Sequence, residues 1–160
     1  MLARPATLDD VAAIARIYNQ AIDDRTSTFE TRSRTLDEVA RWLDGVHPLV
    51  VVEWSGHIVA YAATSAYSER ACYRGVAEFA VYVDRDHRTR GAGRLALTSL
   101  FEAAREAGFW KLVSRIFPEN TAARKLNQAV GVREIGVHRK HARLDGAWHD
   151  VIVVERLLDD

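Results

Sequence analysis

The chain has 160 residues, of which 48% are hydrophobic and 28% charged, and its formal net charge is zero. This length and composition are typical of a soluble globular protein with a real core, so we expect a single domain over residues 1–160. Zero net charge and the lack of a transmembrane-length apolar stretch argue against nucleic acid and membrane partners, and the single cysteine, Cys72, excludes an internal disulfide framework and favours the cytoplasm.

The N-terminal part of the chain predicts one strand and two capped helices. After a short strand over residues 2–4, Thr7-Leu-Asp-Asp10 resembles a capping box with Asp in place of the usual Glu. The helix that follows has an apolar face made of Val11, Ile14, Ala15, Tyr18, Ala21 and Ile22. Beyond a polar loop, Thr35-Leu-Asp-Glu38 caps a second helix, which we expect to bury Val39, Trp42 and Leu43 and to stop at Gly45.

The loop over residues 23–34 contains one large apolar side chain, Phe29, with Glu30 beside it. Phe29 either packs into the core or forms the wall of a substrate pocket, to which Glu30 would then also belong. The residues themselves leave both interpretations open.

A hairpin and an irregular segment come next. Apolar runs at 48–54 and 58–63 are joined by Ser55-Gly56, which is a hairpin signal. The polar segment 65–75 carries Arg70, Tyr73 and Arg74. An arginine here could bind a substrate carboxylate in bidentate fashion; the alternative is a solvated loop with surface arginines.

Glu78 is the most informative acidic residue, because it begins an apolar run that ends at Asp84. Alternation places Phe79, Val81 and Val83 on one face of this strand, and Glu78, Ala80 and Tyr82 on the other. A carboxylate inside a central strand is costly if it is buried without a partner, which favours a catalytic role. The alternative is a structural ion pair with Arg74 or Arg115.

A glycine-containing turn connects this strand to a helix over residues 95–107, whose apolar face contains Leu97, Leu100, Phe101 and Ala104. A strand, a glycine turn and a helix N-terminus together form an anion-binding device, because unpaired N–H groups and the positive end of the helix dipole point at one place. A purely structural turn is the alternative, but such a turn does not need arginines. The turn therefore predicts a pyrophosphate site made of Arg88, Thr89, Arg90, Gly91, Ala92, Gly93 and Arg94.

The residues that follow the turn restrict which class of nucleotide cofactor it could bind. A dinucleotide fingerprint also fits the glycines, but it requires an acidic residue about 20 residues further on, at the end of the next strand. That strand, over residues 109–117, carries no acid before Glu119. No Gly-Lys-Ser/Thr follows the turn, so a phosphate loop of the Walker type is excluded.

The C-terminal third completes a parallel βαβ unit and adds a hairpin. Asn120 caps a helix over residues 122–130, and strands at 132–144 and 147–158 are joined by Asp145-Gly146, a type I′ turn signal. Three histidines lie in these strands, but they have neither a cysteine nor helical spacing beside them, so we expect no metal site. They are His138, His141 and His149.

Taken together, these segments resemble the GNAT acetyltransferases, and most closely the phosphinothricin N-acetyltransferase and L-amino acid N-acyltransferase branch. The resemblance runs nearly end to end and rests on Arg4-Pro-Ala-Thr, Thr28-Phe-Glu-Thr31, Glu78-x-Ala-Val-Tyr-Val83, Arg88-x-x-Gly-x-Gly93, Asn120, Gly131 and Gly146-x-Trp-x-Asp-Val151. It implies an α/β fold with a mixed, mostly antiparallel twisted sheet of about seven strands and about four helices, splayed between the two central parallel strands.

The resemblance also implies the chemistry. Acetyl-coenzyme A would be the donor, and the acceptor would be the primary amine of a small amino acid or analogue such as phosphinothricin, methionine sulfone or methionine sulfoximine. Glu78 would act as general base. The backbone of Val81, Tyr82 and Val83 and the side chain of Asn120 would contact the cofactor, while Phe29, Glu30, Arg70, Tyr73 and Arg74 would line the acceptor site. Relatives often form homodimers, which we expect here.

Two positions depart from the family pattern. Asn127 stands where many relatives carry the Tyr or His that protonates the departing thiolate, and a neutral amide is no acid near neutral pH. Val132 replaces an aromatic residue after Gly131. These departures keep two alternatives open, namely a catalytically weak acyl-coenzyme A sensor and an enzyme that acts on a protein N-terminus or another amine.

Overall fold

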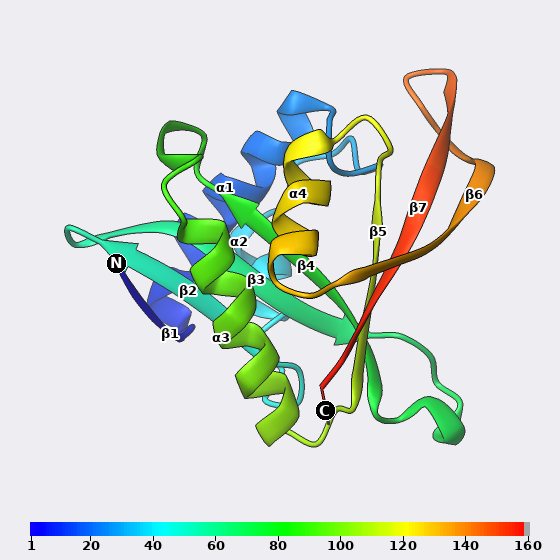
Figure 1. Ribbon diagram of the computed structural model, residues 1–160. Coiled ribbons are helices and arrows are strands. Elements are labelled where there is room, and N and C mark those ends of the chain that lie inside the picture. The colour runs from blue at the N-terminus through cyan, green and yellow to red at the C-terminus, as the bar shows by residue number, and fades with distance from the viewer. Residues whose placement is uncertain (159–160) are drawn as a thin grey trace.

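One seven-stranded sheet runs through the computed structural model, which describes residues 1–158, and four α-helices pack against it (Figure 1). In chain order the elements are β1 (Leu2–Pro5), α1 (Val11–Asp24), α2 (Leu36–Ala40), β2 (Leu49–Trp54), β3 (His57–Ala66), β4 (Val76–Val83), α3 (Ala92–Glu106), β5 (Lys111–Ile116), α4 (Thr121–Ala129), β6 (Arg133–Leu144) and β7 (Ala147–Leu157).

The strand order in the sheet is β1-β2-β3-β4-β5-β7-β6. Every neighbouring pair is antiparallel except β4 and β5, which are parallel and are connected through α3. The expected mixed, mostly antiparallel sheet with two parallel central strands is therefore confirmed.

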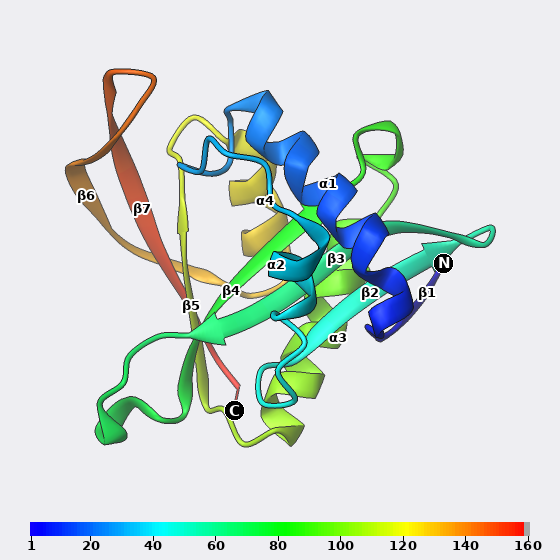
Figure 2. The ribbon, with the colours of Figure 1, turned by 180° about the vertical axis from the view of Figure 1, so that it is seen from behind.

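The helices cover both faces of the sheet. Helices α3 and α4 lie on the face that Figure 1 presents, and α1 and α2 lie on the opposite face, which Figure 2 presents. The alternation predicted for β4 is confirmed, because Phe79 packs edge to face against Phe101 of α3 with ring centroids 5.9 Å apart, whereas Tyr82 packs against Tyr18 of α1 with centroids 5.2 Å apart. Each face of β4 thus contributes to a different core cluster.

The two parallel strands separate after a short contact. Their ladder contains three register pairs and ends with Glu78 opposite Val113. Beyond this pair β4 continues to Val83 and β5 to Ile116, and the two strands diverge (Figure 1). Among the described residues no strand pairs with this edge of β4 beyond Glu78, so the expected splay is present.

Several element boundaries differ from the sequence expectation. Helix α2 ends at Ala40 instead of reaching Gly45, because the N–H groups of Trp42 and Leu43 bond three residues back, to Val39 and Ala40, and so tighten the last turn. Strand β3 extends to Ala66, and the supposedly irregular segment contains a 3₁₀ turn at Ala71–Tyr73.

The last hairpin has the predicted turn. Asp145 and Gly146 have φ values of 50° and 80°, as a type I′ turn requires at both central residues. Strand β6 is irregular, with register shifts between Glu134 and Gly136 and between His138 and Ala142. Within residues 1–158, no helix is long and apolar enough to span a membrane.

Candidate active site

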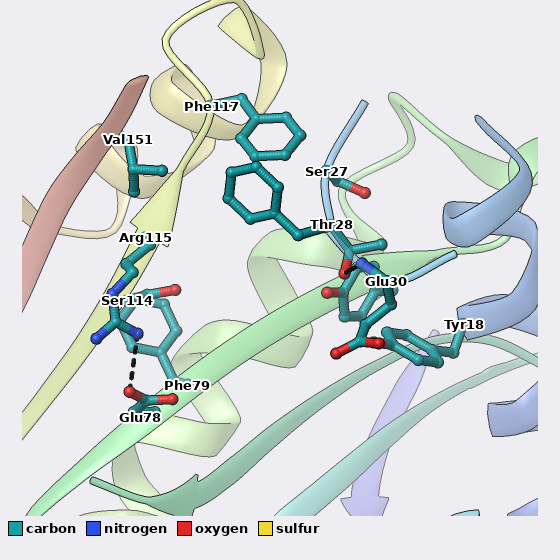
Figure 3. Close-up of a pocket in the computed structure, with 12 residues that line it drawn as sticks. Tyr18, Ser27, Thr28, Glu30, Glu78, Phe79, Ser114, Arg115, Phe117 and Val151 are labelled. Carbon is teal, nitrogen blue, oxygen red and sulfur yellow. Dashed lines mark hydrogen bonds and ion pairs between the residues drawn. The ribbon is translucent and has the colours of Figure 1, made fainter. Parts of the chain in front are cut away.

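Glu78 lies at the point where β4 and β5 part. Its Oε1 accepts a hydrogen bond from Nη1 of Arg115 on β5 at 2.9 Å (Figure 3). The Glu78 side chain is 33% exposed and that of Arg115 48% exposed, so this pair is accessible and not the buried ion pair considered from the sequence. Of the two arginines proposed as partners, the structure selects Arg115 over Arg74.

A pocket of about 320 Å³ opens beside Glu78, and we call it the Glu78 pocket. Figure 3 shows how β4, β5, β7 and the loop after α1 contribute to its wall. Phe29 lies in this wall, with its ring 4.7 Å from that of Phe117, so it is a pocket residue and not only a core residue. The lining consists of Tyr18, Ser27, Thr28, Phe29, Glu30, Glu78, Phe79, Tyr82, Ser114, Arg115, Phe117 and Val151.

A second hollow of about 520 Å³ adjoins the first on the α1–α2 side of β4. It shares five lining residues with the Glu78 pocket: Tyr18, Glu30, Glu78, Phe79 and Tyr82. Burial raises the pKa of Tyr18 and of Tyr82 above the usual range, so both hydroxyl groups stay protonated at neutral pH. Glu78 is thus reachable from a polar and aromatic cavity on this face.

The edge of β4 that faces the gap carries free backbone groups. The N–H of Asp84 donates to Val59 of β3, and alternate residues of a strand point their amides to the same side. The amides of Tyr82 and Ala80 therefore also face β3, whereas those of Phe79, Val81 and Val83 face the β5 side. The Glu78–Val113 register pair uses the Phe79 amide, so the amides of Val81 and Val83 are the ones that face the gap. An extended ligand that carries amides could pair with these groups as an added strand would.

The N-terminus of α3 is left uncapped. Gly91 occupies the N-cap position with φ of 88° and makes no side-chain cap, and the first helical bond runs from the Leu95 N–H to the Gly91 carbonyl. The N–H groups of Ala92, Gly93 and Arg94 therefore have no acceptor within the helix. The shorter helices α2 and α4 are both capped by side chains, so the exposed amides of α3 are suited to an anion.

The arginines around this turn differ in whether their guanidinium groups are already paired with a carboxylate. Nη2 of Arg88 lies 2.8 Å from Asp24 Oδ2, so its charge is already paired. The Arg90 guanidinium lies 5.2 Å from the ring centre of Trp54. Within the described part of the chain Arg94 forms no ion pair, and neither does Arg90. Thr89 adopts a left-handed φ of 64° and bonds the Arg88 carbonyl.

Gly93 has a packing role in addition to the cofactor-binding role predicted for it. It lies inside the first turn of α3, is buried, and an added Cβ would come within 3.1 Å of Leu126 and 3.2 Å of Val83. The glycine thus permits close packing of α3 on α4 and β4. Around Gly91, by contrast, a Cβ would meet nothing within 4 Å, so Gly91 is the glycine that is open to a ligand.

The two asparagines of α4 lie in different surroundings. Asn120 caps the helix by accepting from the Ala123 N–H at 3.1 Å, as one of its two expected roles requires. Asn127 is 5% exposed and donates to the Ala123 carbonyl at 2.8 Å, but its Oδ1 has no partner. It borders a separate hollow between α4 and β6 and does not line the Glu78 pocket.

The structure does not bring Arg70, Tyr73 and Arg74 to the Glu78 pocket. All three are exposed on or beside the 3₁₀ turn before β4. Arg70 lies over the ring of Tyr73 at 5.5 Å, and Arg74 lies over that of Trp110 at 5.8 Å. Their assignment to the acceptor site stays a prediction.

Sequence reasoning missed several residues of the pocket. Tyr18 was assigned only to the core face of α1, although the same periodicity could have placed it at the pocket rim. Phe117 directly follows β5 and Val151 lies in β7, so the two are distant in the sequence, and no local pattern marks them. Arg115 was considered only as a structural partner of Glu78.

Comparison with known proteins decides between the interpretations of the glycine turn. The family model described as "Acetyltransferase (GNAT) domain" matches residues 4–153. The chain belongs to the GNAT acetyltransferase family. The match includes Glu78, the splay and the α3 turn, so this GNAT protein is an acetyltransferase by family, and the dinucleotide interpretation of the turn is not needed.

Two curated relatives and one solved structure illustrate the similarity. The GNAT protein is 31% identical to the phosphinothricin N-acetyltransferase of Streptomyces viridochromogenes, over 92% of this chain and 82% of that protein. It is 29% identical to the L-amino acid N-acyltransferase MnaT of Escherichia coli, over 100% and 95% of the two chains. The yncA acetyltransferase of Salmonella typhimurium, solved with its cofactor acetyl-CoA, matches with a TM-score of 0.94 and 27% identity, over 100% and 95% of the chains.

Proposed function

We propose that this GNAT protein transfers an acetyl group from acetyl-coenzyme A to the primary amine of a small amino acid or analogue. The names of its relatives point to this class of acceptor, which includes phosphinothricin, methionine sulfoximine and methionine sulfone. Both reactants bind together, and the amine attacks the acetyl group directly.

The observation that carries the proposal is the position of Glu78. Its carboxylate faces a pocket where the β4–β5 ladder ends, and the free amides of β4 begin a short way further along the strand, at Val81. A proton acceptor and hydrogen-bond donors for a carbonyl oxygen thus lie on the same strand, at the place where it leaves its neighbour. This is the pair of groups that acyl transfer to an amine requires.

The groups available for the donor fit acetyl-coenzyme A, which supplies an acetyl group already activated as a thioester. The open N-terminus of α3, with Gly91 and the unpaired Arg90 and Arg94, suits linked phosphates. The gap-facing edge of β4 suits an arm that carries amides. Arg88, Thr89, Ala92, Gly93 and Asn120 complete the proposed cofactor site.

At the reacting centre Glu78 removes the proton of the acceptor amine, directly or through a water molecule. The gap-facing amides of Val81 and Val83 bind the acetyl oxygen as it gains negative charge. Holding the amine in line with the acetyl carbon supplies much of the rate. Phe29, Glu30, Arg70, Tyr73 and Arg74 are the proposed acceptor-binding residues, of which Phe29 and Glu30 line the Glu78 pocket.

Asn127 acts as a hydrogen-bond partner and not as an acid in this proposal. Its unpaired Oδ1 is available to accept a hydrogen bond from the released thiol. Solvent must first protonate the departing thiolate, in place of the family's Tyr or His, because only a protonated thiol can donate to Oδ1. A slower reaction than in relatives with a side-chain acid is the expected consequence.

The setting of the reaction is proposed from the surface and from the relatives. We place the protein in the cytoplasm as one N-acetyltransferase domain over residues 1–160, with resistance to an amino acid-like antibiotic or herbicide as one role.

We also propose a homodimer through the edge strand β6, where apolar side chains are exposed. These include Ile135 and Val137, with Trp148 on the neighbouring strand β7. Light scattering of the protein and of Val137→Lys tests the dimer.

Steady-state release of free thiol tests the proposed function. The panel contains L-amino acids, their sulfone and sulfoximine analogues, a polyamine and a peptide with a free N-terminus. Turnover that is fastest with the amino acids and that drops in Glu78→Gln supports the proposal. Tight coenzyme A binding without turnover of any amine would favour the sensor alternative, which the absence of an acid at Asn127 motivates. Preference for the peptide would favour an enzyme that modifies protein N-termini.

A further inference from the structure

We propose that Arg115 binds the carboxylate of the acceptor and makes the enzyme selective for α-amino acids over simple amines. This inference rests on the proposed acetyl transfer and names the residue that sets its acceptor class. The decisive juxtaposition is Arg115 on β5 beside Glu78 on β4, both in the wall of one pocket.

Arg115 lies on the acceptor side of the sheet. Val113 is opposite Glu78 in the ladder, and alternate residues of a strand share a face, so the side chains of Arg115 and Glu78 emerge on the same face. This face is covered by α1 and α2, and on it Tyr82 of β4 packs against Tyr18 of α1. The N-terminus of α3, which we assign to the donor phosphates, begins a helix on the other face (Figure 1).

The charges of the pocket suit a zwitterion. Glu30 and Glu78 are its two carboxylates, and Arg115 is the one cationic side chain among its lining residues in the described chain. An ammonium group is attracted by the carboxylates, and a carboxylate by Arg115. A polyamine would instead bring further positive charge against Arg115.

The Arg115 guanidinium has capacity left for a ligand. Within residues 1–158 its recorded hydrogen bond is the one to Glu78, whereas a guanidinium has five N–H donors in a planar fork. Its side chain is about half exposed, so a carboxylate can approach it. Bidentate arginine–carboxylate pairing is among the strong polar contacts available to a small acid.

The spacing favours an α-amino acid in particular. Glu78 and Arg115 are in direct contact at 2.9 Å, so the amine and the acid group that they bind must also be neighbours. In an α-amino acid one carbon separates these groups, which places the nitrogen about 2.5 Å from the carboxyl carbon. A γ-amino acid separates the two groups too far to use both side chains in the same way.

Other arginines near the site are less suitably placed to bind a carboxylate in the Glu78 pocket. Arg70 and Arg74 lie over aromatic rings on the exposed turn before β4 and do not line the pocket. Arg34 is bound to Glu30 at 2.6 Å and its side chain is only 17% exposed. Arg115 is therefore the arginine that a carboxylate in the Glu78 pocket would meet.

Contact with the acceptor also changes the state of Glu78. Before the acceptor arrives, Arg115 occupies Glu78 Oε1. When the acceptor carboxylate takes over the guanidinium, that oxygen becomes free to accept the proton of the neighbouring amine. A simple amine offers Arg115 no replacement partner, so it gains less from the same base.

The test compares L-methionine sulfone with the amine that results from removing its carboxylate. Thiol release gives kcat/KM for both substrates with wild type, Arg115→Gln, Arg115→Lys, Arg70→Gln and the exposed α3 control Arg105→Gln. In Arg115→Gln we expect kcat/KM for the amino acid to fall ten- to hundredfold, and that for the amine to change less than threefold. Arg115→Lys keeps the positive charge but loses the planar fork of N–H donors. Its kcat/KM for the amino acid should lie between those of wild type and Arg115→Gln.

Several results would overturn the inference. Equal losses for both substrates would mean that Arg115 only orders Glu78, and a selective loss in Arg70→Gln alone would move the carboxylate site to the turn before β4. Thermal unfolding of each variant identifies a folding defect. For a variant that is folded, activity retained on the amine shows that the loss with the amino acid concerns recognition of the carboxylate and not the integrity of the site. If wild type acetylates the amine and ignores amino acids, the proposed acceptor class fails and the role of Arg115 fails with it. If wild type acetylates amino acids and Arg115→Gln keeps the wild-type ratio, only the role of Arg115 fails.

Discussion

Glu78 and Val113 form the last register pair of the parallel β4–β5 ladder. From Val81 onward the gap-facing amides of β4 have no neighbouring strand, while Glu78 itself is still held by the sheet. The proposed base is therefore anchored on regular structure, and the free amides that complete the site begin a few residues further along the same strand. Catalytic groups that are supported by strands hold their geometry better than groups on loops.

Replacement of Glu78 by Gln should remove proton abstraction while the fold is retained. We expect kcat/KM to fall about 10²- to 10⁴-fold, the usual contribution of general base catalysis. Stability should change by less than about 1 kcal/mol, because the pair with Arg115 is exposed. Thiol-release rates and thermal unfolding measure both quantities, with Glu102→Gln on the exposed face of α3 as the control. Unchanged turnover would remove Glu78 from the mechanism.

The arginines at the start of α3 should contribute unequally to coenzyme A binding. Neutralisation of Arg90 or Arg94 should weaken binding about two- to fivefold, since a charge near a helix terminus contributes about 0.3–1 kcal/mol. Arg88→Gln should have a smaller effect, because Asp24 already pairs with Arg88. Calorimetry at low and high salt measures this, and the differences should shrink as salt screens the charges. Arg105→Gln, at the far end of the same helix, is the control, and an equal loss there would contradict a local phosphate site.

Gly93 should be required for packing. In Gly93→Val even the first carbon would lie 3.1 Å from Leu126, so we expect a loss of about 1–3 kcal/mol in the free energy of unfolding. Gly136→Val in strand β6 meets nothing within 4 Å and should be nearly neutral. Urea unfolding of the two variants provides the comparison. Similar stability of both would show that α3 can move away from α4 and β4 at little cost.

Asn127 should matter more for turnover than for stability. Its Oδ1 is buried without a partner, and leucine is similar in size to asparagine. The free energy of unfolding of Asn127→Leu should therefore lie within about 1 kcal/mol of the wild-type value. If Oδ1 bonds the thiol, kcat should fall about two- to tenfold, as for the loss of one hydrogen bond. Gln128→Leu, exposed on the same helix, serves as the control. An unchanged kcat would leave Asn127 without a role in the reaction.

Acid should destabilise the protein through Asp84. Burial alone would raise the pKa of this carboxyl, but the Arg16 guanidinium, the Asp86 N–H and His87 lower it from 3.8 to about 2. Because the folded-state pKa lies below the unfolded one, the stabilisation is present above about pH 4 and is lost as the pH falls toward 2. The shift corresponds to at most about 2 kcal/mol. Urea unfolding from pH 6 to pH 2 should show a shallower pH dependence in Asp84→Asn, and an identical slope would contradict this assignment.

Much of the architecture was predictable because it is encoded locally. The order of helices and strands follows from apolar periodicity, and the type I′ turn at Asp145-Gly146 follows from residues that tolerate positive φ. The Thr35–Glu38 capping box and the cap at Asn120 are likewise short-range features. The length of α2 was not predictable, since i to i+3 bonds after Ala40 end the helix early.

The candidate site likewise has a part that the sequence predicts and a part that it does not. Its anion-binding turn and its acidic residue could be recognised in the sequence, because strand, glycine turn, helix and Glu78 lie within one continuous stretch. The partner of Glu78 could not be chosen, because Arg115 is 37 residues away and Arg74 only a few. Strand register alone brings Arg115 onto the face of Glu78, and only the packing of β7 and the loop after α1 places Val151 and Phe29 in one wall. Such contacts between distant segments depend on how the whole sheet twists and opens, and no local pattern of residues carries that information.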